Sequence, residues 1–387
     1  MRWLSIIRLA RFVRTSSGRS DRGAISMIVA VLLGGVVVLG AASLSIDVGN
    51  IMWERRQLQN GADASALSLA QTCARTPAQC TNAAALTSLA PLNNANASDN
   101  LNGFDGVCGR PASLGSPCPS DVQKPPVPLL TDCPVLPSWL LNSTIPYVEA
   151  HTRTQTPSGS ILRPFVAQSF GYPGETVKAC ARAAWGPPGN GTAIVPVTFS
   201  LCNWYLSTAN GTSYPAVETA LPFNGANDAA CATWAGHNFP GGFGWLFHDA
   251  TCSVKTDQNG WVDALTGLGA GNDCGSVIQS MVGKTVYLPI FDCMDPSKNF
   301  CPGVTSTGTH SWYHIKGYAA FHLTAVDVTG PVKANEPGYP TLAAKALCAA
   351  KGGKCMYGWF LGNMVTSLGA IDPTAPNLGL TVIQPVG

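Results

Sequence analysis

Residues 23–46 read GAISMIVAVLLGGVVVLGAASLSI, an uninterrupted stretch of 24 residues without a charged side chain. As a helix this stretch would rise about 36 Å, slightly more than the roughly 30 Å of a bilayer's hydrocarbon core. It therefore predicts one transmembrane helix that spans the bilayer with some tilt. A cleaved secretory signal is the competing interpretation, because Ala41, Ala42 and Ser43 offer small residues to a peptidase. The apolar run is nevertheless longer than the usual signal core of about 7 to 15 residues.

The charges that flank this stretch predict its orientation. Six arginines and a single aspartate precede it, whereas Arg55 and Arg56 on the other side are diluted by Asp47 and Glu54. The positive-inside bias places the basic end in the cytoplasm and exports the rest of the chain. We therefore expect a single-pass protein of the cell membrane, with a cytoplasmic N-terminus and a large extracellular or periplasmic domain. The arginines are Arg2, Arg8, Arg11, Arg14, Arg19 and Arg22.

The cysteines agree with export. The chain has 14 of them, all beyond the apolar stretch, and no two have the two-residue spacing of a zinc knuckle or redox motif. Disulfides are the favoured interpretation, and free thiols in a reducing compartment are the alternative. Neighbours in sequence could close small loops, namely Cys73 with Cys80, Cys293 with Cys301 and Cys348 with Cys355, but the sequence leaves the connectivity open. The full set is Cys73, Cys80, Cys108, Cys118, Cys133, Cys180, Cys202, Cys231, Cys252, Cys274, Cys293, Cys301, Cys348 and Cys355.

The hydrophobic pattern divides the chain into five parts. Residues 1–22 form the basic tail, and residues 23–47 form the membrane helix. Apolar side chains then recur at helical spacing, so residues 48–74 are expected to continue that helix as an amphipathic stalk. Residues 75–145 are rich in Cys, Pro and Asn and are typical of a loop-rich connector. Residues 146–387 are expected to fold as a mainly β domain with minor α content and one substantial core or two small ones.

Alternating apolar residues predict the strands of this domain. The alternation covers residues 195–201, 286–290 and 319–325, with further strands expected at 177–183 and 356–365. Pro196 and Pro289 lack a backbone donor, so their strands are expected at sheet edges or to contain bulges. Residues 341–350 are a helical candidate. Aromatic residues such as Trp204, Phe243 and Phe247 gather in the middle of the domain, where core packing is favoured over an exposed glycan-binding or protein-binding cluster.

Three motifs mark the membrane junction. Arg22 and Gly23 open the apolar stretch, Asp47-Val48-Gly49 closes it, and residues 54–67 read ERRQLQNGADASAL. This pattern resembles the TadE/TadG-like N-terminal module of Flp (tight-adherence) pilus assembly proteins. The resemblance covers about 50 of the 387 residues. It implies a membrane-anchored structural component of pilus assembly whose partners are other pilus assembly or pilin-like membrane proteins.

Two departures limit what the resemblance implies. Ile28 stands where processed pilin-like relatives have a glutamate, which argues against prepilin-type cleavage. Some TadG-type proteins carry a metal site with the pattern Asp-x-Ser-x-Ser, but the nearest candidate here, at residues 63–67, ends in Leu67. No metal site and no cofactor are expected.

The polar residues of the junction have both a plain and a functional interpretation. Asp47 lies where the span would meet the interface, and we expect its carboxylate to stay solvated there. The stalk residues are either a solvated helix face or a docking surface for another pilus component. Two pairs of small residues within the span, Ala30 with Gly34 and Ala41 with Ser45, would also permit lateral self-association. The favoured interpretation is that these residues simply face lipid. The docking candidates are Arg22, Gly23, Asp47, Gly49, Glu54, Arg55, Arg56, Gln57, Gln59, Asn60 and Asp63.

Enzymatic motifs are weak, and no enzyme is expected. Gly283-Lys284-Thr285 lacks the first glycine of a phosphate-binding loop, and His314 lies in a strand-like pattern. The segment from Asp257 to Gly260 favours a turn over a calcium loop. Without its basic tail the chain is near-neutral, so no partner of nucleic-acid class is expected. The competing hypothesis is a membrane-tethered extracellular domain, unrelated to pili, that binds a ligand or cleaves a surface polymer.

Overall fold

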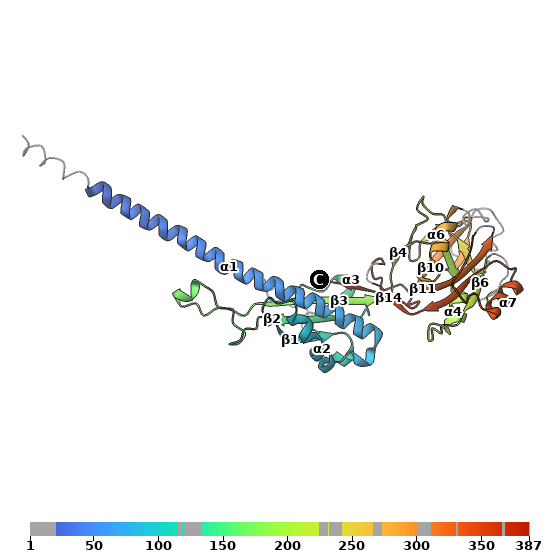
Figure 1. Cartoon of the computed structure of the whole chain (residues 1–387), viewed down its shortest axis with the longest axis horizontal. Helices are drawn as coiled ribbons and strands as arrows, with labels where there is room; N and C mark the ends of the chain where they lie inside the picture. Colours follow the sequence, from blue (N-terminus) through green and yellow to red (C-terminus); the bar gives the residue numbers. More distant parts are fainter. Residues whose placement is uncertain are drawn as a thin grey trace, which may run out of the picture.

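A single long helix, α1 (Asp21–Arg75, 55 residues), forms the rod that runs through the molecule (Figure 1). The computed structural model describes residues 21–114, 118, 133–223, 231, 242–265, 273–299, 311–329, 332–365 and 368–386. The predicted arrangement, a long apolar helix followed by a mainly β, disulfide-rich domain, is confirmed. The helix continues without a break from the apolar stretch into the stalk, as the periodicity predicts.

The C-terminal half of α1 is buried along one face. Leu58, Ala62, Ala66, Leu69 and Ala70 are at most 2 % exposed. They pack against a hairpin formed by β2 (Tyr147–Arg153) and β3 (Lys178–Gly186). Three of the five residues are alanines, so the helix backbone can lie close to the sheet. This contact fixes the stalk to the mainly β domain.

The first sheet has the strand order β1-β2-β3-β15-β14. Its edge strands are β1 (Gly103–Gly109) and β14 (Asn363–Val365), and β15 (Leu380–Pro385) lies between β3 and β14. β15 pairs antiparallel with β3, so strands from both ends of the mainly β region share one sheet. The C-terminal end of the chain accordingly lies beside this sheet (Figure 1).

The stretch predicted as a loop-rich connector, residues 75–145, contains more regular structure than its composition suggests. α2 (Asn82–Asn94) begins after Thr81, whose hydroxyl accepts a hydrogen bond from the Ala84 amide, and packs Ala85 and Leu89 on α1. β1 pairs with β2 along its whole length. Packing on α1 stabilises α2, and pairing with β2 stabilises β1. Local sequence propensity alone does not predict these two elements. The short elements of this stretch are η1 (Pro77–Gln79), η2 (Ala112–Leu114) and α3 (Ser138–Leu141).

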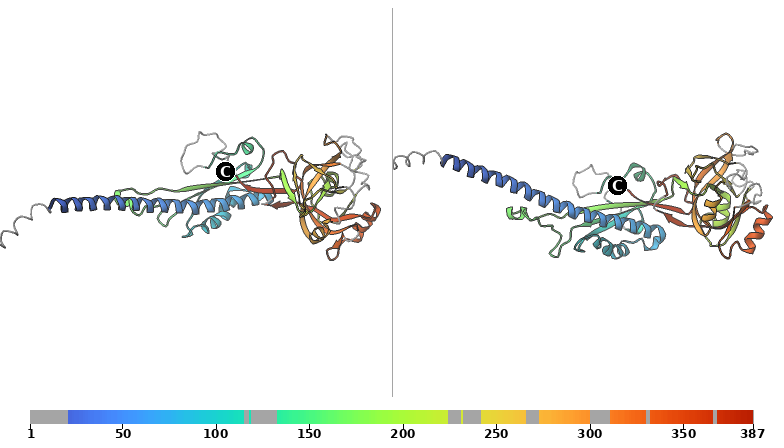
Figure 2. Two further views of the ribbon diagram at one scale, coloured as in Figure 1. Left: turned by 90° about the horizontal axis from the view of Figure 1, so that it is seen from above. Right: turned by 45° about the horizontal axis from the view of Figure 1, so that its top comes forward.

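The second sheet lies beyond the C-terminal end of α1 (Figures 1 and 2). Its strand order is β6-β13-β11-β10-β5-β7, with β9 and β12 also paired to β11. Its main core centres on Phe199, Phe321 and Phe360, whose rings meet edge to face. A smaller buried cluster joins the two sheets, with Tyr318 of β11 beside Val382 of β15 among its members. The strands are β5 (Val197–Ser200), β6 (Thr219–Pro222), β7 (Phe243–Trp245), β9 (Trp261–Asp263), β10 (Lys284–Asp295), β11 (Trp312–Thr329), β12 (Val332–Asn335) and β13 (Cys355–Leu361).

Smaller elements complete the fold. β4 (Asn190–Ala193) and β8 (Val254–Asp257) form a separate two-stranded sheet. The helices around the second sheet are α4 (Leu201–Thr208), α6 (Gly275–Ser280) and α7 (Leu342–Ala350). α7 matches the helix expected at residues 341–350, with Thr341 as its cap.

The structure corrects the expectation for Pro196 and agrees with that for Pro289. β5 is internal, between β10 and β7, and Pro196 lies directly before it rather than within it. Pro289 lies in β10, which is also internal, but the pairing of β10 shifts register just after Ile290. The missing donor of Pro289 is therefore placed next to an irregularity, as expected. Core packing explains Trp204, Phe243 and Trp245, whereas Phe247 is 63 % exposed.

Disulfides connect the described cysteines. Two of the predicted small loops, Cys73–Cys80 and Cys348–Cys355, are confirmed. Cys293 is also disulfide-bonded, and its predicted partner Cys301 lies outside the described residues. Each bridge stabilises the fold by about 2–4 kcal/mol, mainly by constraining the unfolded chain. The remaining pairs are Cys108–Cys118, Cys133–Cys180, Cys202–Cys231 and Cys252–Cys274.

The contact between α1 and α2 yields a testable prediction at Gly61. A Cβ at this position would lie 2.1 Å from Oδ1 of Asn93, a buried side chain that is itself held by hydrogen bonds to the carbonyls of Asn102 and Gly103. We expect Gly61→Ala to lower the free energy of unfolding by about 1–3 kcal/mol, the usual cost of overpacking. Thermal unfolding of the full chain in detergent measures it.

Gly49 lies on the same helix and is the matched control, because a Cβ at Gly49 would meet no atom within 4 Å. Gly49→Ala should stabilise the helix by about 0.5–1 kcal/mol through its better helix propensity. Equal effects of the two substitutions would contradict the close approach of α1 and α2.

Candidate functional site at the membrane junction

The N-terminal half of α1 is exposed and apolar. Large hydrophobic side chains are exposed from Ile25 to Trp53, and beyond Trp53 the helix exposes no further large hydrophobic residue among those described. Within the described part of the chain, α1 alone is long and apolar enough to cross a membrane. It is compatible with a single-pass anchor. Arg22 and Gly23 lie in its first turn.

Contrary to the expectation, the Asp47 carboxylate is not solvated, because the chain's own mainly β domain binds it. Oδ1 accepts hydrogen bonds from the backbone amides of Phe165 (2.7 Å) and Val166 (3.2 Å), and Oδ2 accepts one from Ala167 (2.9 Å). The residue is only 7 % exposed. Hydrogen bonds to an ionised acceptor are stronger than neutral ones. Asp47 therefore fastens the segment at 165–167 to the end of the apolar stretch.

Three further candidates on the stalk also contact other parts of the chain. Gln57 is buried and its Oε1 accepts from the Ser98 amide, while Gln59 Nε2 donates to the Cys180 carbonyl (3.0 Å). Glu54 is half-buried beside Thr154. These side chains are used internally. Docking of a partner at these three residues stays a prediction that competes with these internal contacts.

The remaining stalk candidates lie on the opposite face. Arg56, Asn60 and Asp63 are exposed and follow Trp53 at spacings of three, four and three residues. Residues at these spacings line one side of an α-helix. Trp53, Arg56, Asn60 and Asp63 define what we call the outer stripe. Arg55 is half-buried. Gly49 lies four residues before Trp53, and a Cβ at Gly49 would meet no atom within 4 Å.

Burial changes the acidity of Glu54. Desolvation raises the pKa of its carboxyl, a hydrogen bond from Thr154 lowers it, and the nearby negative charge of Asp99 raises it, so that the pKa lies above its ordinary value of 4.5. An acid with a raised pKa in the folded state destabilises that state when it ionises. Ionised Glu54 therefore stabilises the contact between stalk and domain less than its neutral form does.

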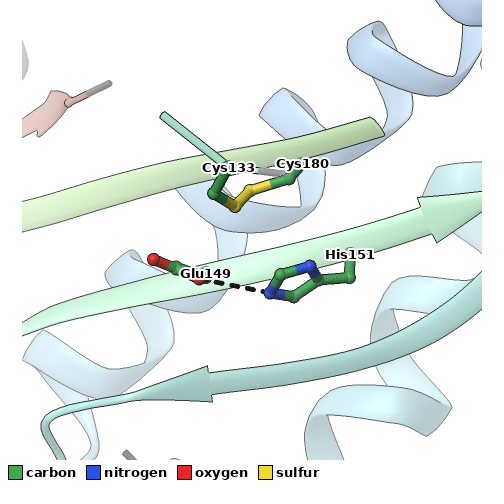
Figure 3. A group of neighbouring side chains, drawn as sticks. All are labelled: Cys133, Glu149, His151 and Cys180. Atoms are coloured by element: carbon green, nitrogen blue, oxygen red, sulfur yellow. Dashed lines mark hydrogen bonds and ion pairs between the residues drawn. A yellow bond between two sulfur atoms is a disulfide. The ribbon is translucent and has the colours of Figure 1, made fainter. Parts of the chain in front are cut away.

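A second polar cluster lies on the face of the first sheet that points away from α1. Glu149 and Arg182 are both buried and form an ion pair, and His151 Nε2 lies 3.2 Å from Glu149 Oε2. Figure 3 shows the Cys133–Cys180 disulfide beside Glu149 and His151. The four side chains are close enough to hold a metal, but the two sulfurs are bonded to each other. In this state the cluster is a disulfide packed over a buried ion pair.

Sequence reasoning missed this ion pair. The strand alternation around β3 predicts that Cys180 and Arg182 share one face, but it gives no sign that Glu149 lies opposite Arg182 across the hairpin. The weak enzymatic motifs resolve as ordinary structure. Lys284 begins β10, and the Gly260 amide donates to the Asp257 carbonyl in a turn. His314 lies on β11 with Nδ1 2.7 Å from Asp292 Oδ1, and His310 lies outside the described residues.

Comparison with known proteins identifies the N-terminal module. Residues 23–71 match the family described as putative Flp pilus-assembly TadE/G-like. The matched segment begins in the first turn of α1 and ends four residues before that helix does. It contains Asp47 and the whole outer stripe, so the recognition from sequence is confirmed for this module. Neither a curated protein nor a solved structure matches the chain.

The hydrogen bonds of Asp47 are testable by substitution. We expect Asp47→Asn to expose the amides of Phe165, Val166 and Ala167, because an uncharged amide with one acceptor oxygen cannot replace a carboxylate that binds all three. Hydrogen exchange of the full chain in detergent should show faster exchange at residues 165–167. The exposed Asp63 is the control, and Asp63→Asn should leave these amides protected. Unchanged protection in Asp47→Asn would refute the assigned contact.

The raised pKa of Glu54 predicts a pH-dependent effect. At neutral pH, Glu54→Gln should raise the melting temperature, because it removes an ionised group from a half-buried position. The advantage should shrink as the pH falls through the raised pKa and disappear below the ordinary value of 4.5, where the wild-type side chain is neutral in both states. Melting curves of both proteins across pH 4 to 8, at roughly one-unit steps, measure the difference. A constant difference across this range would count against the assignment.

Proposed function

We propose that this protein is a membrane-anchored structural component of Flp/Tad-type pilus assembly and acts through protein contacts rather than catalysis. One observation carries the proposal. The segment that matches the pilus-assembly family is the same helix that joins the apolar stretch to the exported domain. A partner that binds this helix would be coupled directly to the domain, because α1 packs against both β2 and β3.

The outer stripe is the surface of the module that remains for a partner. The inward face of the same turns is filled by Gln57, Leu58 and Ala62, which contact the exported domain. Arg56, Asn60 and Asp63 instead offer one positive, one neutral and one negative group at helical spacing. Such a stripe suits helix-to-helix contact with another pilus assembly or pilin-like membrane protein.

The proposed orientation places the domain outside the cytoplasm. The arginines before α1 favour a cytoplasmic N-terminus. The disulfides are consistent with an oxidising compartment on the other side. The exported domain would then lie at the cell surface or in the periplasm, with the stalk standing just above the bilayer.

Deleting the gene and counting surface filaments by electron microscopy tests the role. We expect the deletion to lose filaments and the wild-type gene to restore them. Arg56→Glu should restore fewer filaments, because it reverses a charge in the outer stripe. Lys345→Glu is the matched control, since Lys345 is an exposed residue of α7, far from the stalk along the chain.

The outcomes separate the possible roles. Unchanged piliation and adherence after deletion would refute the assembly role and favour a tethered domain unrelated to pili. If Arg56→Glu restores the full number of filaments, the assembly role stands but the outer stripe is not the docking surface. Equal amounts of both variants at the membrane, measured by immunoblot, exclude a simple loss of protein.

A further inference from the structure

The hairpin of β2 and β3 does not end in a short turn. Residues 154–177, here called the hairpin extension, continue beyond the two strands and lie along α1 toward its apolar half (Figures 1 and 2). Its two arms pair between Leu162 and Glu175, and Thr154 pairs with Val177 at its base. The short helix η4 (Ala167–Phe170) lies at its far end. The extension is therefore an ordered structure.

The far end of the extension exposes apolar and aromatic side chains. Phe165 is 73 % exposed, Ile161 is 46 % exposed and Tyr172 is 44 % exposed. Arg163 and Glu175 are the only charged residues among the 24 of the extension. Glu175 is engaged with the Tyr172 hydroxyl (3.3 Å), whereas Arg163 is exposed. A surface with this composition is typical of a membrane interface, where aromatic rings and a long basic side chain are favoured.

Asp47 fixes the height of this surface relative to the membrane helix. The Phe165 amide is 2.7 Å from the Asp47 carboxylate, and Asp47 directly follows the last residue of the uncharged run. That run is about 6 Å longer than a hydrocarbon core, so its end reaches the headgroup layer. The exposed apolar surface of α1 also continues past Asp47 to Met52 and Trp53. Helix and extension thus present apolar side chains at the same level.

We propose that the hairpin extension is a second membrane contact, seated in the interfacial layer of the leaflet on the side of the exported domain. Phe165, Ile161 and Tyr172 lie among the headgroups and the upper acyl chains, and Arg163 reaches the lipid phosphates. The occupant of this surface is lipid. The inference rests on the membrane anchor proposed above and not on any role in pili. With two contacts, the bilayer restricts the tilt and rotation of α1.

Lipid-borne quenchers test this contact in the full chain. Every cysteine among the described residues is disulfide-bonded, so an introduced cysteine supplies the thiol to be labelled. Phe165→Cys and, as a second reporter, Tyr172→Cys are labelled with the environment-sensitive dye NBD and reconstituted into nanodiscs of phosphatidylcholine and phosphatidylglycerol. The discs are made with and without nitroxide-bearing lipids, the nitroxide placed either near the headgroup or deep in the acyl chain.

Two further positions calibrate the measurement. Val37 is 70 % exposed in the middle of the apolar stretch and reports whether that stretch is in the bilayer. Leu342 is 86 % exposed on α7 and is the control for an exposed apolar position on the second-sheet side of the molecule. We expect loss of fluorescence at Val37→Cys with the deep nitroxide, loss at Phe165→Cys and Tyr172→Cys mainly with the shallow nitroxide, and none at Leu342→Cys. A single reactive thiol in each variant confirms that the disulfides are intact.

Each remaining outcome overturns the proposal in a distinguishable way. If the Val37 reporter is quenched while the Phe165 and Tyr172 reporters stay as bright as the Leu342 reporter, the anchor stands and the second contact does not. If the Val37 reporter is not quenched, the anchor fails and the second contact fails with it. If the Phe165 and Tyr172 reporters are quenched only when two labelled copies share a disc, the occupant is a second copy of the chain rather than lipid.

Discussion

The close packing of α1 on the β2–β3 hairpin is the constraint on which the arrangement of the whole molecule depends. The helix presents Leu58, Ala62, Ala66 and Leu69 to the sheet, and these side chains are almost completely buried. Fully burying a leucine is worth roughly 1.5–3 kcal/mol, and the small alanines let the sheet come close enough for the larger residues to be covered. Because the same helix continues without a break into the apolar stretch, the mainly β domain cannot turn independently of it. The direction of the apolar stretch therefore sets the direction of the domain.

Polar contacts extend this attachment down to the level of the proposed membrane surface. Asp47 binds the hairpin extension, Gln57 and Gln59 bind the loop at Ser98 and strand β3, and Thr152 donates to the Leu58 carbonyl. The family-matched segment consequently has two faces with different tasks. Its inner face holds the chain's own domain, and its outer stripe is exposed. Polar residues that look alike in the sequence fall on different sides, since a shift of one position on a helix rotates a side chain by about 100°.

The sequence predicts those features whose signal is local. The long helix, the strands β3, β5, β10 and β11, and the helix α7 all follow from periodicity within one segment. β1 is different: it contains Gly103, Gly106 and Gly109 and has low strand propensity, and it becomes a strand because it pairs with β2. Two of these glycines fit a close approach, since a Cβ at Gly109 would lie 2.4 Å from the Tyr147 carbonyl oxygen and one at Gly103 would lie 2.9 Å from the Arg153 side chain. The contacts of Asp47 could likewise not be predicted from the local sequence, because its hydrogen-bond partners begin 118 residues further along the chain.

The connectivity of the two sheets determines how the second sheet is attached to the stalk. Its strands, from β5 to β13, lie between β3 and β14 in the chain, so the second sheet is an insertion within the first. β13 ends at Leu361 and β14 begins at Asn363, so the chain returns to the first sheet with only Gly362 between the two strands. β14 pairs with β15, and β15 pairs with β3, which packs on α1. A force applied to the second sheet is therefore carried to the helix through paired strands rather than through a flexible linker. The apolar helix and the second sheet are therefore joined by packed and paired elements along the whole path between them.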